Sequence, residues 1–435
     1  MKRVFAPSKP HKIGFLEATS IGIGGMVGGG IFAVLGLAVV MARGGTVIAF
    51  AVAGAVALLT AYAYARLSVA LPSQGGTVTF LNQAYGKGLL TGTLNVLLWL
   101  SYIIMLSLYA YAFGSYGATF FPASLQTIAR HGLISGIIAA ITLLNMLGAD
   151  QIARAEDWIV AIKLLILVFF VVVGGMGIKA ARLAPSTWAS PLNLVAGGMI
   201  IFVAYEGFEL IANAGGDVRN PQRTLPRAFY ASVVAVIVLY LLIAAVTVGN
   251  LPLDKIAAAR DYALAAAARP MLGQAGFTLI AIAALLSTTS AINATLYGSA
   301  RLSFNIAKDG QLPASLEKPI WHKPLEGLFI TSALTLVVAN VLDLSSISTI
   351  GSAGFLIIFG AVNLANVRLR RQTHARAWVS VIGTLVCGLA LAALIWRTAT
   401  RAPGKLWVLA GLLLLSFLIE AGYRLARKRD IRVAA

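Results

Sequence analysis

Apolar segments of about 20 residues recur along almost the whole chain, and this pattern restricts the fold more than any other feature. Such a segment, coiled at about 1.5 Å per residue, matches the hydrocarbon thickness of a bilayer. Inside that layer a single segment satisfies its own backbone polar groups only as a helix. The sequence therefore predicts an all-α polytopic membrane protein with twelve transmembrane helices, at 13–40, 46–71, 89–120, 132–148, 157–178, 194–214, 227–249, 273–300, 327–343, 346–367, 377–396 and 405–425.

The composition supports a membrane protein and a single domain. Of the 435 residues, 59% are hydrophobic and 11% charged, whereas soluble proteins contain about a quarter charged residues. No polar stretch is long enough for a soluble domain, so residues 1–435 are expected to form one transmembrane domain. The net charge of +19 would suggest nucleic acid binding in a soluble protein, but these cations lie in short loops. We therefore expect membrane lipid, and no nucleic acid, around the chain.

The distribution of Lys and Arg predicts the orientation. If the N-terminus is cytoplasmic, the inside segments carry roughly twice as many of these residues as the outside loops, as the positive-inside rule requires. We expect a multi-pass protein of the inner or plasma membrane with both termini in the cytoplasm. The four histidines and the single cysteine, Cys387, show no metal-ligand spacing and are assigned no site.

The first and sixth spans are unusual. Six glycines fall within positions 22–30, and each costs about 1 kcal/mol relative to alanine in a helix interior. Close helix packing would explain pairs such as Gly24 and Gly28, but not six glycines in this stretch, so we expect the helix to break. The sixth span carries Glu206 and Glu209, which would cost roughly 2.5 kcal/mol or more each if they faced lipid.

Broken helices in these positions are typical of inverted-repeat transporters. The two spans open consecutive sets of five, so we expect a first repeat at 13–178, a second at 194–367, and two additional helices at 377–425. A half-helix N-terminus favours an anion and a half-helix C-terminus favours a cation. Together they suit a zwitterion such as an amino acid, although other small charged solutes would fit the same geometry.

Three sequence motifs resemble the amino acid–polyamine–organocation superfamily of transporters, which share a five-plus-five inverted repeat. Those motifs are Gly22–Phe32, ending in Gly-Ile-Phe; Leu71–Gly76 with Ala84–Gly86; and Phe202–Glu209, continuing to Asn220-Pro221 and Leu225–Ala228. Two positions depart from the family pattern, because Arg66 and Gly216 stand where a glutamate is common. These departures concern the charge network of the inner gate and leave the backbone site for the substrate unaffected.

The resemblance also implies roles for individual residues. The segment Trp158–Leu167 is similar to the fifth helix of prokaryotic proton-coupled amino acid transporters, in which a lysine replaces a sodium site. The proton would then be the coupling ion, with no other cofactor, and Lys163 would carry it. The implied partners of this lysine are the carbonyl of Gly24 and the hydroxyls of Ser287, Thr288, Thr289 and Ser290. The implied substrate site comprises Met26, Gly28, Gly29, Gly30, Phe202, Val203, Tyr205, Glu206 and Gly207, with Phe208 and Glu209 as a possible gate.

Each charged candidate also has a structural explanation. Desolvation favours the neutral amine of Lys163, which suits proton exchange, but carbonyls and hydroxyls would equally hold it as a fixed cation. Glu206 and Glu209 are three residues apart and share one helical face; they either serve the substrate and a gate or bond to free amides at the break. Hydroxyls in membrane helices, such as that of Thr288, often bond to the preceding turn.

The sequence predicts a secondary transporter that imports amino acids with protons by alternating access. The alternative is an exchanger of amino acids or amines without proton coupling. An enzyme is not expected, because the sequence has no nucleophile–base pair and no metal cluster. The expected contacts to the substrate are backbone groups, so they specify no particular side chain, and no oligomeric state is favoured.

Overall fold

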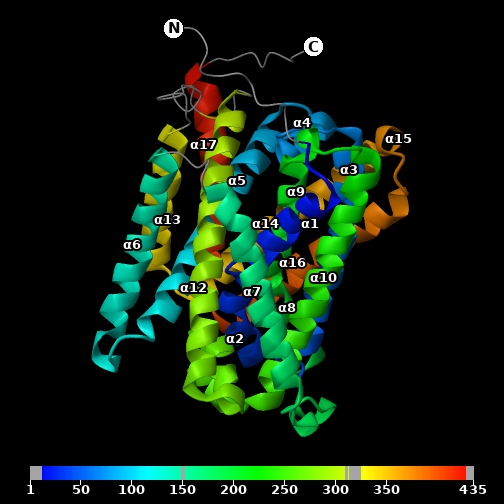
Figure 1. Cartoon of the computed structure of the whole chain (residues 1–435). Coiled ribbons are helices and arrows are strands. Elements are labelled where there is room, and N and C mark those ends of the chain that lie inside the picture. The colour runs from blue at the N-terminus through cyan, green and yellow to red at the C-terminus, as the bar shows by residue number, and fades with distance from the viewer. Residues whose placement is uncertain (1–11, 148–151, 309–311, 313–324, 428–435) are drawn as a thin grey trace.

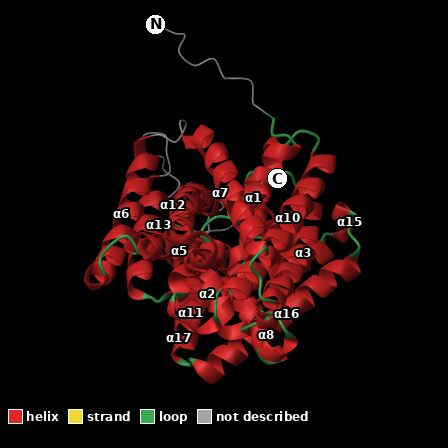
Figure 2. Ribbon diagram, turned by 60° about the horizontal axis from the view of Figure 1, so that its bottom comes forward, coloured by secondary structure: helices red, strands yellow, loops and turns green. Residues whose placement is uncertain are grey.

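The computed structural model describes residues 12–147, 152–308, 312 and 325–427. Over these residues every regular secondary-structure element is a helix, and no strand is present (Figure 2). The predicted all-α polytopic membrane fold is confirmed.

Nine of the described helices are long and apolar enough to cross a bilayer. They are α3 (Thr46–Ala70), α5 (Leu89–Ala118), α6 (Gln126–Leu147), α7 (Ile152–Gly175), α10 (Pro221–Asn250), α12 (Ala263–Lys308), α14 (Leu344–Arg368), α16 (Ala377–Arg401) and α17 (Gly404–Arg427). Each overlaps one of the predicted spans.

Two further spans are broken, as the glycines and the buried glutamates predicted. Helix α1 (Phe15–Met26) and helix α2 (Gly30–Ala42) meet at 46°, so the break lies at residues 27–29. Helix α8 (Pro191–Ile200) leads into a 3-10 segment, Phe202–Glu209, and then into α9 (Leu210–Asn213), with a bend of 44°. Counting each pair as one span gives eleven among the described residues. The predicted ninth span is the shorter apolar helix α13 (Leu325–Val341).

Three short helices lie in predicted loops: α4 (Gly76–Tyr85), α11 (Leu253–Ala258) and α15 (Arg370–Thr373). They are too short to produce an apolar run of membrane length, which is why the sequence pattern did not reveal them. Helix α12 is longer than the predicted span at 273–300, because a second helical stretch precedes a kink at Gly273, where φ is 61°.

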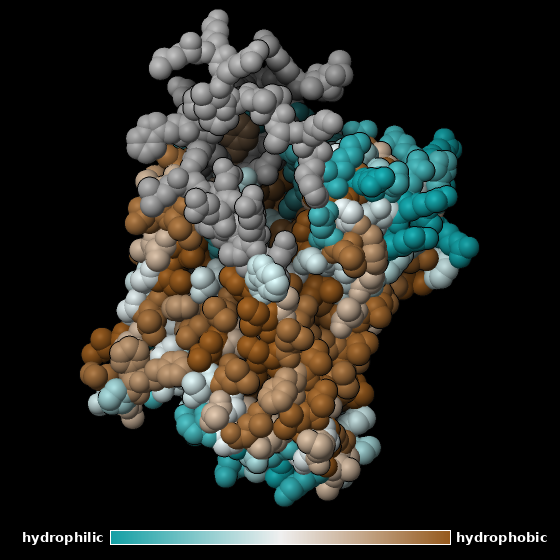
Figure 3. Space-filling model, in the orientation of Figure 1, coloured by the Kyte–Doolittle hydropathy of each residue, from teal (hydrophilic) through white to brown (hydrophobic). Residues whose placement is uncertain are grey.

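Helix α5 lies at the centre of the bundle (Figure 1). Of its most apolar window 94% is buried, against 17% for α17 at the periphery. Helix α12 packs against α5, α10 packs against α3 and α1, and α14 packs against α16. The outward surfaces of the peripheral helices expose large apolar side chains, including Trp158, Leu165, Leu389 and Leu418. Figure 3 shows one face of the molecule, on which a hydrophobic band lies between polar ends, as expected for contact with lipid.

Candidate functional site

The two broken spans touch backbone to backbone. A Cβ added at Gly207 would lie 2.2 Å from the carbonyl carbon of Gly25, and one added at Gly30 would lie 2.8 Å from Cα of Ala204. No side chain fits at these contacts. The glycines of the first span therefore do two things: they permit the break, and they allow the sixth span to approach it.

The first amides of α2 are available at the break. Within the part of the chain that the structure describes, the backbone N–H groups of Gly28, Gly29 and Gly30 have no hydrogen-bond acceptor. They lie at a helix N-terminus, where the dipole favours negative charge. This arrangement is suited to a carboxylate.

The carbonyls of the first break are bonded to side chains from three other helices. Ser287 of α12 donates to the carbonyls of Val27 and Gly28 at 2.8 and 2.6 Å. Tyr240 of α10 donates to the Met26 carbonyl at 2.6 Å, and its hydroxyl also lies 3.3 Å from the Ala204 carbonyl of the other break. Tyr240 was not predicted as a site residue, because one tyrosine in a long apolar helix is typical of ordinary packing.

Lys163 of α7 is the third side chain at this break. It is fully buried, and its Nζ donates to the Gly24 carbonyl at 3.2 Å. Thr288 and Thr289 bond to the carbonyls of Ala284 and Leu285 on their own helix. Of these three neighbouring hydroxyls, that of Ser287 reaches across to the break, and Thr288 and Thr289 have the ordinary bonding of hydroxyls in membrane helices.

The second break is held by α14. Ser348 and Ser352 donate to the Ile200 carbonyl at 2.6 and 2.9 Å, and the Ser352 hydroxyl accepts from the amide of Val203 at 3.0 Å. These serines were not predicted as site residues. Their signal in the sequence is the run of small and polar residues at 345–354 inside an apolar span.

The two glutamates have different surroundings, although each is at most 2% exposed. The Oε2 atom of Glu209 accepts from the hydroxyls of Tyr64 and Thr77 at 2.9 and 3.2 Å. The Oε2 atom of Glu206 is buried, and the described residues supply no partner for it. Neither carboxylate bonds to a free amide of the break among the described residues. Glu209 therefore joins the 3-10 segment to α3 and α4, whereas Glu206 keeps an acceptor available.

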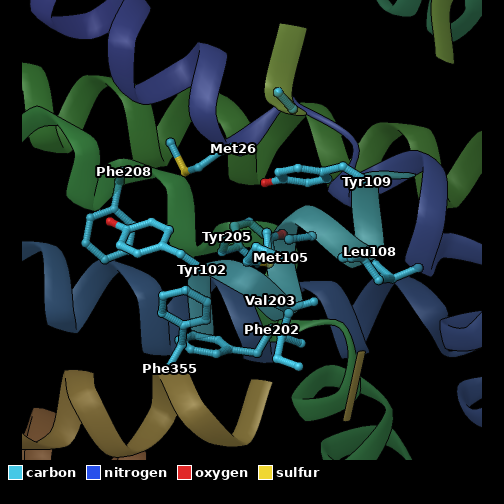
Figure 4. Close-up of a cluster of buried hydrophobic side chains, with 14 of the residues drawn as sticks. Met26, Tyr102, Met105, Leu108, Tyr109, Phe202, Val203, Tyr205, Phe208 and Phe355 are labelled. Carbon is cyan, nitrogen blue, oxygen red and sulfur yellow. The ribbon is translucent and has the colours of Figure 1, made fainter. Parts of the chain in front are cut away.

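Aromatic side chains enclose the break (Figure 4). The Tyr109 ring of α5 lies against Gly29, whose added Cβ would be 2.4 Å from Cδ1 of the ring. The aromatic residues of the 3-10 segment point to different neighbours. Phe202 and Phe208 pack against Phe359, with ring centroids 5.8 and 5.3 Å away. Tyr205 lies 5.0 Å from the Tyr240 ring and donates to the Phe50 carbonyl.

A second set of contacts lies at the α9 end of the site. The Nε2 atom of Gln74, in the loop after α3, donates to Oδ2 of Asp217 at 3.1 Å, and the backbones of Ile13 and Val218 pair beside it. Gly216 lies against Ser73 and Gln74. Arg66, the other departure from the family pattern, lies over the Tyr62 ring. The neutral side-chain amide of Gln74 thus binds Asp217 in the region where Gly216 departs from the charge network of the family pattern.

Comparisons with known proteins agree with this architecture. The family model described as "Amino acid permease" matches residues 13–418. The inner membrane transport protein YbaT of Escherichia coli is 35% identical over 408 residues, covering 92% of this chain and 94% of that protein. Two Bacillus subtilis proteins are each 26% identical: the branched-chain amino acid permease BcaP, over 94% of this chain and 92% of its own, and the methylthioribose transporter, over 82% and 80%. The chain therefore belongs to the amino acid permease family of the amino acid–polyamine–organocation superfamily, and is a polytopic membrane transporter and not an enzyme.

Proposed function

We propose that this permease imports an amino acid together with a proton by alternating access. The observation that carries the proposal is the contact of the buried Lys163 amine with the Gly24 carbonyl, in the last turn of the broken helix α1. An ionisable group buried inside a membrane protein is costly and is usually functional. Here the group touches the same break that offers its amides to a substrate.

The substrate site is proposed between the two breaks. The carboxylate would accept from the amides of Gly28, Gly29 and Gly30, and the amino group would lie near the carbonyls of Met26, Phe202, Val203 and Glu206. The Met26 carbonyl already accepts from Tyr240. Because a carbonyl oxygen has two lone pairs, it can bond to this hydroxyl and to a substrate ammonium at the same time.

Proton coupling follows from the two forms of Lys163. The protonated amine has three donors and no acceptor, so it fastens α7 to the Gly24 carbonyl. The neutral amine binds this carbonyl more weakly and lets α1 move relative to α7. Substrate import is coupled to proton entry if the outward and inward conformations differ in their affinity for this proton.

The wider architecture is proposed to follow the five-plus-five plan. Residues 13–178 and 194–367 would form the two inverted repeats, with α16 and α17 added to them. Both termini would be cytoplasmic in an inner or plasma membrane, in agreement with the excess of Lys and Arg on that side. The broken spans α1–α2 and α8–α9 then occupy equivalent places at the start of each repeat.

Transport by purified protein in proteoliposomes tests the proposal. Counterflow against a panel of labelled amino acids, amines and methylthioribose identifies the substrate class. Accumulation is then measured with an imposed inward proton gradient and no internal substrate. Concentrative uptake under these conditions supports symport. Uptake that requires internal substrate and does not change with the proton gradient would overturn symport and support exchange.

The exchanger remains a second candidate because of Glu206. Its buried carboxylate has an oxygen without a described partner, and it lies in the segment where the substrate amino group is expected. A second cationic group on the substrate, as in a diamine or a basic amino acid, would satisfy this oxygen. Preferential counterflow of cationic substrates would support this candidate.

A further inference from the structure

A cavity of about 390 Å³ opens on the surface where α2 ends, α8 begins and α16 ends. It is separate from the two breaks and independent of the proposed transport function. Three arginines line it, and of the described residues that form its wall none is acidic. The wall residues used below are Arg43, Trp188, Ser190, Asn193, Arg397 and Arg401.

These arginines differ from several other cations on the same predicted side, which form ion pairs. Arg130 and Arg260 pair with Asp261, and Lys405 pairs with Asp343. Across the described chain, the guanidinium groups of the three cavity arginines form no ion pair and no hydrogen bond. The Nε atom of Arg397 is moreover buried. A buried donor without an acceptor is destabilising and uncommon in folded proteins.

The backbone around the cavity adds positive potential. Helix α8 begins at Pro191, and the hydroxyl of its N-cap residue, Ser190, does not cap the helix. The positive end of this ten-residue helix therefore adjoins the arginines. An arginine at a helix C-terminus is favoured by the helix dipole, and this explains Arg401 at the end of α16. It does not explain Arg397, one turn earlier, whose buried Nε atom has no acceptor among the described residues.

Arg43 holds an unusual backbone conformation. Its φ is 53° and its ψ is −130°, a backbone conformation that favours glycine. The arginine adopts this conformation itself, and the two glycines of the turn, Gly44 and Gly45, come after it. The backbone of Arg43 pairs with that of Trp188. The backbone of this strained residue is thus fixed where Arg43 lines the same cavity as Arg397 and Arg401.

The surroundings place the cavity at the depth of lipid headgroups. Trp188 lines it, and Trp396 of α16, one residue before Arg397, is 62% exposed. Tryptophan is enriched at the membrane–water interface. A phosphate diester located there would offer oxygens to the guanidinium forks and to the α8 amides together.

We propose that this cavity is a binding site for a phosphate oxyanion, supplied by the headgroup of an anionic phospholipid or by free phosphate. The arginines would hold the oxyanion, and Asn193 and Ser190 would add neutral donors. The bound group would tie α2, α8 and α16 together. It would thereby stabilise the outer halves of both broken spans.

The test measures the unfolding temperature of the purified full-length protein in detergent. Phosphatidylglycerol, phosphatidylcholine and inorganic phosphate are each titrated, and native mass spectrometry counts the retained lipid. We expect phosphatidylglycerol to stabilise the wild type more than phosphatidylcholine does. Arg397→Gln and Arg43→Gln should each raise the required concentration about ten-fold, as loss of a charge-assisted contact predicts.

The matched control is Arg269→Gln. Arg269 stacks over Phe277, does not line the cavity, and should leave the titration unchanged. Stabilisation by phosphatidylglycerol alone assigns the site to lipid, and equal stabilisation by inorganic phosphate assigns it to the free ion. The proposal is overturned if no probe stabilises the wild type, or if Arg397→Gln responds as Arg269→Gln does. If Arg397→Gln folds poorly, Arg43→Gln takes its place in the comparison with Arg269→Gln.

Discussion

The hydroxyl of Tyr240 donates to the carbonyl of Met26 at 2.6 Å and lies 3.3 Å from the carbonyl of Ala204. One side chain of α10 thus bridges the ends of two broken helices that are far apart in sequence. The bridge fixes the relative position of the two carbonyls. It also explains how these breaks stay ordered without a continuous helix through either of them.

Replacing Tyr240 with phenylalanine should weaken substrate binding. The ring would keep its packing against Tyr205, but the break carbonyls would lose a hydrogen bond with a net value of about 1 kcal/mol. We expect KM for uptake to rise about five-fold, a factor that corresponds to this free energy, with little change in the amount of folded protein. Uptake kinetics in proteoliposomes measure the effect.

The control for this prediction is Tyr116→Phe. Tyr116 is also a buried tyrosine that donates to a carbonyl, that of Phe32 inside α2. Its loss should reduce stability by a similar amount and leave KM nearly unchanged. Equal changes of KM in the two variants would mean that the Tyr240 bridge has no special relation to the substrate.

A second prediction concerns Gly29. A substitution at this position affects the fold as well as the site, because even the Cβ of alanine at Gly29 would lie 2.4 Å from the Tyr109 ring. Gly29→Ala should therefore lower the unfolding temperature as well as substrate binding, by overpacking that costs typically 1–3 kcal/mol.

The double variant Gly29→Ala with Tyr109→Leu separates these effects. Removing the ring relieves the clash, so part of the lost stability should return. Gly298→Ala is the control, since an added Cβ there meets no atom within 4 Å and alanine favours the helix. If the double variant is no more stable than Gly29→Ala, the contact with Tyr109 is not the cause.

The sequence predicts the breaks better than it predicts their neighbours. Glycine density in the first span and buried carboxylates in the sixth are local signals, and both breaks occur at those positions. The partners of the breaks come from distant segments: Tyr240 is 214 positions from Met26, and Ser352 is 152 from Ile200. A single polar residue in an apolar helix has no periodic pattern, so composition and spacing do not reveal which carbonyl it meets.

The family resemblance supplied what the pattern lacked. It predicted the contact between Lys163 and Gly24. Sequence spacing does not indicate this contact, because three other spans separate the two helices. It did not distinguish among the hydroxyls of 287–290, since their direction depends on the rotation of α12 about its axis. That rotation is set by packing against α5 and α7.

A third prediction assigns different roles to the two glutamates. Glu206→Gln removes an ionisable carboxyl group from the segment where the substrate amino group is expected. We expect the preference between neutral and cationic substrates to shift about ten-fold toward neutral ones, as loss of a charge-assisted hydrogen bond would cause. Competition of unlabelled neutral and basic amino acids against the labelled substrate measures this preference.

Glu209→Gln is the matched comparison. The Glu209 carboxylate bonds to Tyr64 and Thr77, so its replacement should alter the transport rate through the contacts of α3 and α4 with the 3-10 segment. The substrate preference should stay as in the wild type. An unchanged preference in Glu206→Gln would assign Glu206 a purely structural role.

The last prediction is that Lys163→Ala uncouples transport from the proton gradient. The Lys163 amine holds α7 to the Gly24 carbonyl in the structure, and alanine can neither bind a proton nor make this contact. If coupling depends on two conformations with different proton affinity, each pKa unit between them contributes about 1.4 kcal/mol to the driving force. The variant should therefore lose accumulation driven by an imposed pH gradient and retain counterflow.

Ser287→Ala is the control, because it removes hydrogen bonds to the carbonyls of Val27 and Gly28 without removing a group that takes up a proton. It should weaken binding and still respond to the gradient. Accumulation by Lys163→Ala under the gradient would show that this lysine is a fixed cation, and would move the search for the proton site to Glu206 and Glu209.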